Sequence, residues 1–569
     1  MAISYFDKPT GTYFTETDLT QYSIGNPVVG ACVITPTVKG KTLVPTYVTS
    51  IDQYYDFFGS SFKSGSDYYE YQGSLLAKSY FDNGGTSLLV VPVKSGSYAP
   101  ATSSVLNTVS SGSVAFTIET LNDGSILNNS GGEIANSNGA LINGTVDNVR
   151  WEVSNVSVAK GTFDLKVRQG SDNNKRKVVL ESFFDLTLDP NSDNYISKVI
   201  GDVTYTYDPT EQYVQKVGSY DNKSKYIRIS NVNTKTPDYF DNAGVAKTAY
   251  ATSLPIVASG SFAGGSDGTL IHPQLFFENA TSANTQGFNA TCQGYLDALD
   301  LISDKNTYEF DLLYLPALTS NTHPIIISKA IDVCEQRGDS LAVLDAVGYN
   351  KTYQDAITEA SGYDSSYGTF YFNHVQSYVP SLGKNVWTPP TIQVAGAYAY
   401  SAKANNLFFV PAGYNNALLG TVSQTKYHLK EDVKGLLEKG NVNMIGYHPR
   451  FKYVVLGQNT LSQKNSSLDR NNVRILVNST KRQLVYISNK YLNVLGAEAT
   501  IFNFKNEVTT LLDKLVKQNG YSAYKITIDE SAETIDRNEL QVTIEIIPIK
   551  AIEKIVFNMI LRPTGTVFA

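Results

Sequence analysis

The chain has 569 residues, a formal net charge of −7 and 17% charged side chains. This mild acidic balance leaves no basic footprint for nucleic acid, and a hydrophobic content of 42% excludes wholesale disorder. Few charges together with 38 tyrosines predict a surface that other protein molecules cover, because tyrosine is enriched at interfaces.

The first 94 residues predict an extended arm followed by an α/β layer. Residues 1–20 hold few large aliphatic side chains, so we expect a linking arm without a core of its own. Residues 21–94 predict strands and helices in alternation, the pattern of an α/β layer. Within this range Ser50 is a candidate N-cap for a helix that ends near Gly59.

The composition changes near residue 95. Residues 95–250 are rich in Ser, Gly and Asn and carry short alternating runs, which predict an inserted β-rich outer domain. The α/β pattern resumes over residues 251–435 as the second part of the core. There Pro324 predicts the first position of a helix, and Gly338 its C-cap.

The last quarter of the chain predicts an α+β domain. We assign residues 436–547 to a C-terminal inner domain with a long helix that follows Ser467 and ends near Gly496. A second helix and two strands complete this domain. Residues 548–569 contain a further strand and form a C-terminal arm.

The residues of metal and thiol chemistry are scarce. The five histidines lack metal-ligand spacing, and the three cysteines are isolated, so we expect no metal, no cofactor and no disulfide framework. No run approaches 18 apolar residues, and the first residues lack the pattern of a secretory signal. We therefore expect neither a membrane span nor a leader.

Three motifs resemble sites of chemistry, and the sequence favours a structural role for each. Gly264–Gly268 matches a nucleophile elbow around Ser266, but no helix start follows, so a glycine-rich turn is the better interpretation. Gly25 and Gly30 have phosphate-loop spacing without the lysine. The carboxylates near Asp529 have no supporting histidine and predict a solvated loop. We expect no catalytic residue.

A run of basic residues marks the long C-terminal helix. Its cations Arg470, Arg474, Lys481 and Arg482 face a single acidic neighbour, Asp469. The simplest interpretation is a solvated face, and the alternative is a docking surface for an acidic protein.

An ordered series of motifs resembles the contractile phage tail sheath proteins, in particular the T4-like sheaths. Each motif is short, but their order holds along nearly the whole chain outside residues 95–250. The motifs are Pro9-x-Gly11-x-Tyr13-Phe14-x-Glu16, Val48-Thr49-Ser50 with Phe58-Gly59, Tyr80–Gly85 with Leu89–Val93, Gly264–Gly268, Cys334–Asp339 with Leu344-Asp345, Pro389-Pro390 through Gly396, Pro411-Ala412-Gly413, Asp469-Arg470-x-x-Val473-Arg474 and Ile535–Glu539.

The resemblance implies a structural protein rather than an enzyme. Sheath subunits stack as hexameric rings around an inner tail tube, and they contract to drive the tube through the host cell envelope. Implied partners are the tube, the baseplate and the tail terminator or neck proteins. The implied location is the virion tail, after assembly in the host cytoplasm.

The resemblance also implies exchanged terminal strands that link neighbouring subunits. The residues it points to are Tyr13, Phe14, Glu16, Val542, Ile544, Ile546, Ile555 and Phe557. The basic helix is the candidate tube-facing surface. The alternatives are a sheath of a related contractile injection system, such as a secretion system or bacteriocin, a non-contracting structural assembly protein, and a hydrolase that uses Ser266.

Overall fold

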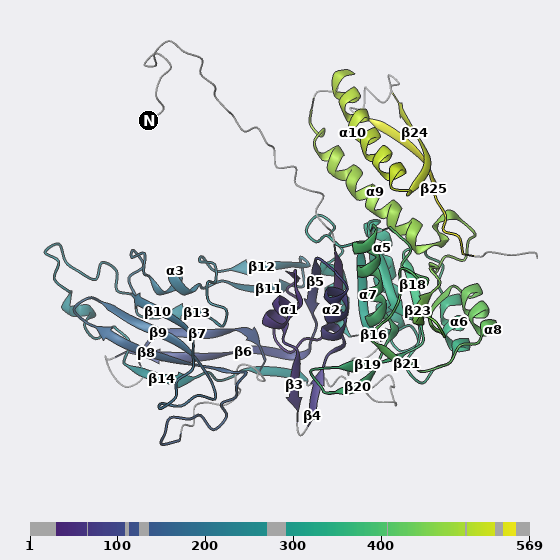
Figure 1. Cartoon of the computed structure of the whole chain (residues 1–569). Coiled ribbons are helices and arrows are strands. Elements are labelled where there is room, and N and C mark those ends of the chain that lie inside the picture. Colours follow the sequence, from purple (N-terminus) through teal and green to yellow (C-terminus); the bar gives the residue numbers. More distant parts are fainter. Residues whose placement is uncertain are drawn as a thin grey trace, which may run out of the picture.

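The computed structural model describes residues 30–64, 67–107, 113–124, 136–269, 292–406, 408–494, 498–529 and 539–553. Figure 1 shows three parts: a central α/β core, an elongated β-rich insertion on one side and a helical C-terminal part that stands on the core. The chain leaves the core for the insertion and then returns to it. Among the described residues, no helix is long and apolar enough to cross a membrane.

An eight-stranded sheet forms the centre of the core. Its inner strands are parallel, and the outermost strand at each edge is antiparallel to its neighbour. Strands that are buried on both faces consist of nearly continuous apolar residues, as β1 and β5 do. In spatial order the strands are β2 (Thr46–Val48), β5 (Leu88–Pro92), β1 (Ala31–Thr35), β16 (Leu312–Thr319), β17 (Leu341–Asp345), β18 (Gly368–Phe372), β22 (Val442–His448) and β23 (Lys452–Leu456).

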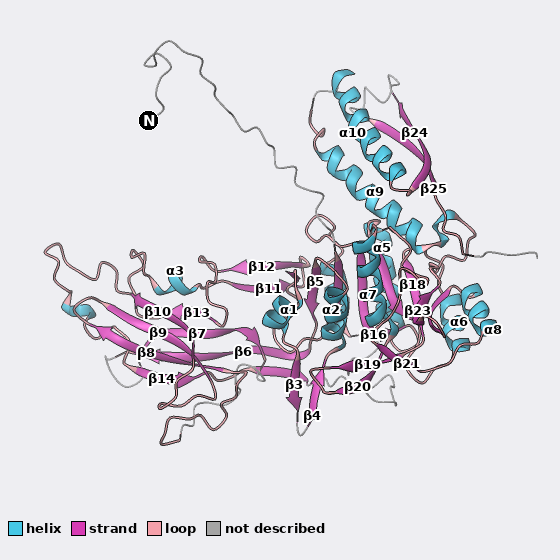
Figure 2. Cartoon of the chain, viewed as in Figure 1, coloured by secondary structure: helices cyan, strands magenta, loops and turns pink. Residues whose placement is uncertain are grey.

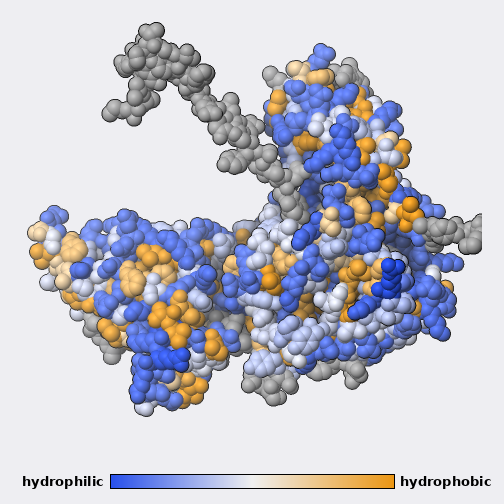
Figure 3. Space-filling view, viewed as in Figure 1, coloured by the Kyte–Doolittle hydropathy of each residue, from blue (hydrophilic) through white to orange (hydrophobic). Residues whose placement is uncertain are grey.

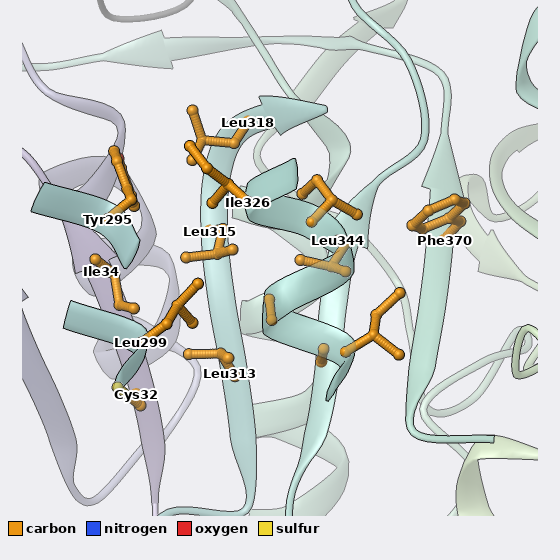
Figure 4. Packing of buried hydrophobic residues seen from close by; sticks show 14 of the residues in the cluster. Cys32, Ile34, Tyr295, Leu299, Leu313, Leu315, Leu318, Ile326, Leu344 and Phe370 are labelled. Carbon is orange, nitrogen blue, oxygen red and sulfur yellow. The ribbon is translucent and has the colours of Figure 1, made fainter. Parts of the chain in front are cut away.

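Helices cover both faces of this sheet. One face packs against α1 (Ile51–Phe58), α2 (Gln72–Asp82) and α7 (Pro390–Ala404). The other packs against α4 (Gln293–Leu301), α5 (Pro324–Arg337), α6 (Tyr353–Ser361) and α8 (Glu431–Lys439). Figure 4 shows the second layer, where side chains of β1, β16, β17 and β18 meet those of α4 and α5.

The helix ends predicted at Ser50, Pro324 and Gly338 in the core are confirmed. The Ser50 hydroxyl accepts a hydrogen bond from the Gln53 amide and caps α1. Pro324 is the first residue of α5, where its missing N–H costs nothing. Gly338 ends α5 in the left-handed conformation, which favours glycine. The eight-stranded sheet with helices on both faces confirms the mixed α/β fold class.

The insertion is a sandwich of two antiparallel sheets, whose strands are magenta in Figure 2. Apolar residues from both sheets share one core, with the rings of Phe116 and Phe163 stacked 5.6 Å apart. One sheet contains β10 (Val179–Leu186), β9 (Thr162–Gln169), β8 (Val149–Ser157) and β14 (Ala258–Ser261). The other contains β13 (Ile227–Val232), β7 (Val114–Asp123), β6 (Ser95–Leu106) and β15 (Ser266–Thr269).

The strands of the insertion do not end at residue 250, because β14 and β15 pair with β8 and β6. The short helix α3 (Ile196–Ile200) and the hairpin of β11 (Thr204–Asp208) and β12 (Tyr213–Val217) also lie within the insertion. The smaller sheets of the core are β3 (Ser61–Ser64) with β4 (Asp67–Glu70), and β20 (Lys384–Thr388), β19 (Val375–Val379) and β21 (Val422–Thr425).

The C-terminal part contains α9 (Asn471–Asn489), α10 (Glu498–Lys517) and a hairpin of β24 (Tyr521–Asp529) and β25 (Gln541–Pro548). The predicted long helix begins later than expected, since Ser467 lies in a short 3-10 turn. It also ends earlier, at Asn489 rather than near residue 496.

Candidate assembly surfaces

The C-terminal hairpin packs one face against the helices. Leu476 of α9 and Val508 and Leu512 of α10 belong to a small core of their own, which Tyr521 of β24 completes. Exposure alternates along both strands, which is the pattern of half-buried strands. The predicted linking residues Val542, Ile544 and Ile546 lie on the half-buried face and pack against this core.

These three side chains therefore hold the hairpin onto its own helices, and the alternate residues of β25 are exposed. Within the described residues, β24 and β25 pair only with each other. A sheet of two strands is marginally stable by itself, and its free edges present unpaired N–H and C=O groups. The hairpin is thus a suitable acceptor for a further strand. The other predicted linking residues, Tyr13, Phe14, Glu16, Ile555 and Phe557, lie outside the described residues.

Two of the four predicted basic residues, Arg474 and Arg482 of α9, are internal, which corrects the prediction of an exposed basic surface for them. Arg482 donates to the Asp311 carboxylate and to the carbonyls of Phe310 and Asp339, at 2.9 and 2.8 Å. Its side chain is only 10% exposed. The guanidinium of Arg474 lies 4.0 Å from the ring centre of Tyr367 and is also buried. Both charges thus serve contacts inside the chain.

The other two basic residues lie nearer the surface. Lys481 is exposed and reaches the Tyr367 hydroxyl at 3.2 Å. Arg470 precedes α9 and forms a bidentate ion pair with Glu553. The sequence pattern predicted all four cations on one helix. It did not indicate the acidic partners Asp311 and Glu553, which lie far away in the chain.

The catalytic alternatives find no support in the geometry. Ser266 lies in β15 and pairs with Ala99, so it is not on a strand-to-helix elbow, and the expected turn is a strand. A Cβ atom at Gly30 would lie 1.8 Å from the Ser87 carbonyl oxygen. This close approach accounts for the glycine, so no phosphate-binding role is needed to explain it. Asp529 ends β24. Gly25 lies outside the described residues, as do Glu530, Glu533 and Asp536.

The thiols of Cys32 and Cys334 and the buried ring of His374 show no sign of activation. Burial raises the pKa of Cys334 to about 12 and raises that of Cys32 well above its ordinary value, so both remain protonated. Burial lowers the pKa of His374 to about 3, which keeps its ring neutral. Among the described residues, no group of three or more His, Cys, Asp or Glu side chains is arranged to hold a metal ion.

The fold has a counterpart among solved structures. The chain is similar in fold to the sheath tail protein Lin1278 from Listeria innocua, with a TM-score of 0.54 over 91% of this chain and 95% of that one. Sequence identity between the two is 12%, so this likeness concerns the fold alone.

Sequence relatives confirm the resemblance to contractile tail sheath proteins. The chain is 25% identical over 438 residues to the tail sheath protein of Vibrio phage KVP40, a match that spans 71% of this chain and 60% of the relative. It is 28% identical over 207 residues to the tail sheath protein of Enterobacteria phage T4, over 36% of this chain and 31% of that one. No protein-family model matches the chain.

Proposed function

We propose that the chain is a structural subunit of the contractile tail sheath of a bacteriophage. The relation to a phage tail sheath protein over 438 residues carries this proposal, and the fold agrees with it. In this role the subunits form hexameric rings, stack around an inner tail tube and contract to drive the tube through the host envelope.

The two terminal segments link the subunits in this proposal. Residues 1–20, and the part of the 548–569 arm that follows Glu553, add strands from neighbouring copies to the edges of the β24–β25 hairpin. Each backbone hydrogen bond contributes about 1 kcal/mol net, so one arm gives only a few kcal/mol. Many arms in an assembled sheath then keep the subunits connected while they move as nearly rigid bodies.

The surface chemistry supports extensive contact with other protein molecules. Figure 3 shows hydrophobic patches on both the insertion and the C-terminal part. Exposed large apolar residues of the insertion include Val179, Phe184 and Val257. A difference in buried surface between two packings supplies the energy of contraction, and no nucleotide is required.

The remaining partners follow from the same role. The tube, the baseplate and the tail terminator or neck proteins bind the assembled sheath, which resides in the virion tail after assembly in the host cytoplasm. Of the predicted tube-facing cations, Lys481 keeps an exposed charge and remains our candidate for that contact. The insertion faces outward, away from the tube.

Polymer formation by the purified protein tests this function. We expect long, ring-stacked tubes in negative stain, and we expect deletion of residues 2–20 to abolish them while the monomer stays folded by circular dichroism. The double substitution Tyr13→Ala/Phe14→Ala, which keeps the arm length, is the matched control for chain length and should weaken assembly. A wild-type protein that never forms tubes contradicts the sheath role, whereas tubes built by the truncated protein contradict only the arm assignment.

A further inference from the structure

The chain returns to the core after the last strand of the hairpin. The Ile549 amide donates to the Gly520 carbonyl at 3.0 Å, which fixes the start of this return. Four residues later, Glu553 accepts two bonds from Arg470, from Nε at 2.7 Å and from Nη2 at 2.9 Å. Gln458 Nε2 donates to the same carboxylate at 3.0 Å. Glu553 is thus held by a planar, bidentate pair and a third donor.

The groups that hold Glu553 are themselves fixed. Gln458 is buried, and its carbonyl accepts a bond of 2.7 Å from the Asn471 amide at the start of α9. Arg470 forms a β-bridge with Asn459, so its backbone is set by the core. The Arg470 side chain is 26% exposed and also lies 3.5 Å from Asp469. The contact with Glu553 therefore ties the end of the described chain to a rigid part of the core.

This tie determines where the following residues start. Residues 549–552 line a groove of about 420 Å³ between the hairpin, the start of α9 and the loop around Phe408. Ile552 is 84% exposed there. A connection of two to five residues is enough to turn a strand back along its neighbour. Residues 549–553 have that length, yet they run to the core instead of turning back along β25.

We propose that Arg470 and Gln458 form a latch on Glu553, and that this latch prevents residues 554–569 from closing on their own hairpin and reserves them for the hairpin of a second copy. The proposal rests on the exchange of terminal strands in the proposed function. The occupant of the neighbouring hairpin edge is the strand predicted at 555–561. The sequence continues for sixteen residues after Glu553, and extended at about 3.3 Å each they reach about 50 Å.

Disulfide trapping separates closure within one chain from exchange between chains. Phe557→Cys provides one thiol, and Thr527→Cys on β24 or Thr543→Cys on β25 provides the other; the three native cysteines are buried. With both thiols in one chain of otherwise wild-type sequence, we expect disulfides mainly between chains. Adding Arg470→Gln or Glu553→Gln should raise the ratio of disulfides within a chain to disulfides between chains at least tenfold. Mixing two populations that carry one thiol each confirms the links between chains.

The charge-swapped pair provides the matched control. Arg470→Glu/Glu553→Arg restores the ion pair with reversed polarity, so we expect it to recover a substantial share of the links between chains that each single reversal loses. In chains that end at residue 553, Arg470→Gln has no further effect on assembly. An unchanged disulfide pattern in Arg470→Gln, with tubes still formed by the wild type, contradicts the latch alone. A wild type that forms neither tubes nor links between chains contradicts the latch together with the strand exchange on which it rests.

Discussion

Arg482 of α9 is paired with Asp311 at the start of β16, 171 residues earlier in the chain. The same guanidinium bonds to the carbonyls of Phe310 and Asp339, so one side chain joins the C-terminal helix to the ends of two core strands. Tyr486, one turn further along α9, donates to the Glu309 carboxylate. The C-terminal part is therefore fixed to the core along most of α9.

Replacing Arg482 by Met leaves the buried Asp311 carboxylate without its counter-ion. We expect a loss of about 3–5 kcal/mol in the free energy of unfolding at pH 8, the usual cost of breaking a buried pair from one side. Urea unfolding measures it. Lys481→Met is the matched control, because its exposed side chain predicts a change within about 0.5 kcal/mol.

The loss in this variant depends on pH. Burial raises the pKa of Asp311 to about 6 in the wild type, although Arg482 opposes the shift. A carboxyl whose folded pKa is raised contributes stability below its unfolded pKa, and this contribution is lost as pH rises through the folded pKa. Without Arg482 the folded pKa rises further, so the deficit is larger at pH 8 than at pH 5. An equal deficit at both values contradicts the role given to the Asp311 charge.

Arg168 is the centre of a charged network in the insertion. It donates to Asp172 through Nε and Nη2, both at 2.8 Å, and to Glu152 at 2.6 Å. Because the insertion has its own core, we expect Arg168→Met to destabilise the insertion by about 3–5 kcal/mol while the α/β core is unaffected. Calorimetry should show a lower midpoint temperature for the unfolding transition of the insertion and an unchanged midpoint for that of the core. A uniform shift of all transitions would mean that the parts unfold as one unit.

The sequence was sufficient where local rules decide the structure. Ser50, Pro324 and Gly338 sit at helix ends for reasons of backbone hydrogen bonding and conformation that act within a few residues. The strands β1 and β17 are buried along their whole length and consist mainly of apolar residues, which is also a local signal. These signals define the α/β core without any knowledge of the distant contacts.

The sequence was insufficient where a partner lies far away in the chain. Nothing near Arg482 indicates Asp311, and nothing near Arg470 indicates Glu553, so both cations were interpreted as surface charge. The return of β14 to β8 is a long-range pairing of the same kind. Gly30 has phosphate-loop spacing from Gly25 without the lysine, which already argued against a phosphate site there; the Ser87 carbonyl now explains the glycine.

The close approach at Gly30 gives a direct test. A Cβ at this position would lie 1.8 Å from the Ser87 carbonyl oxygen, which belongs to the backbone and cannot rotate away. Gly30→Ala should therefore cost about 1–3 kcal/mol or more, because the chain must shift beside the central strands. Gly435→Ala is the control: it lies in α8 with open space around it, and we expect a gain of about 0.5–1 kcal/mol. Urea unfolding of both variants compares them, and a neutral Gly30→Ala contradicts the packing argument.

The buried His374 is expected to lower the stability of the core as pH falls. It is buried with its ring 5.6 Å from that of Tyr349, and burial and the Lys426 charge lower its pKa to about 3. A group with a depressed folded pKa contributes stability above its unfolded pKa of about 6.5, and this stability is lost as pH falls toward the folded pKa. The wild type should thus lose about 1.4 kcal/mol per pH unit through this group between about pH 6.5 and 3. His374→Phe keeps an aromatic ring against Tyr349 and removes the titration, so its acid unfolding midpoint should lie at lower pH than that of the wild type. Fluorescence titration measures the two midpoints, and coincident midpoints would show that His374 does not control acid unfolding.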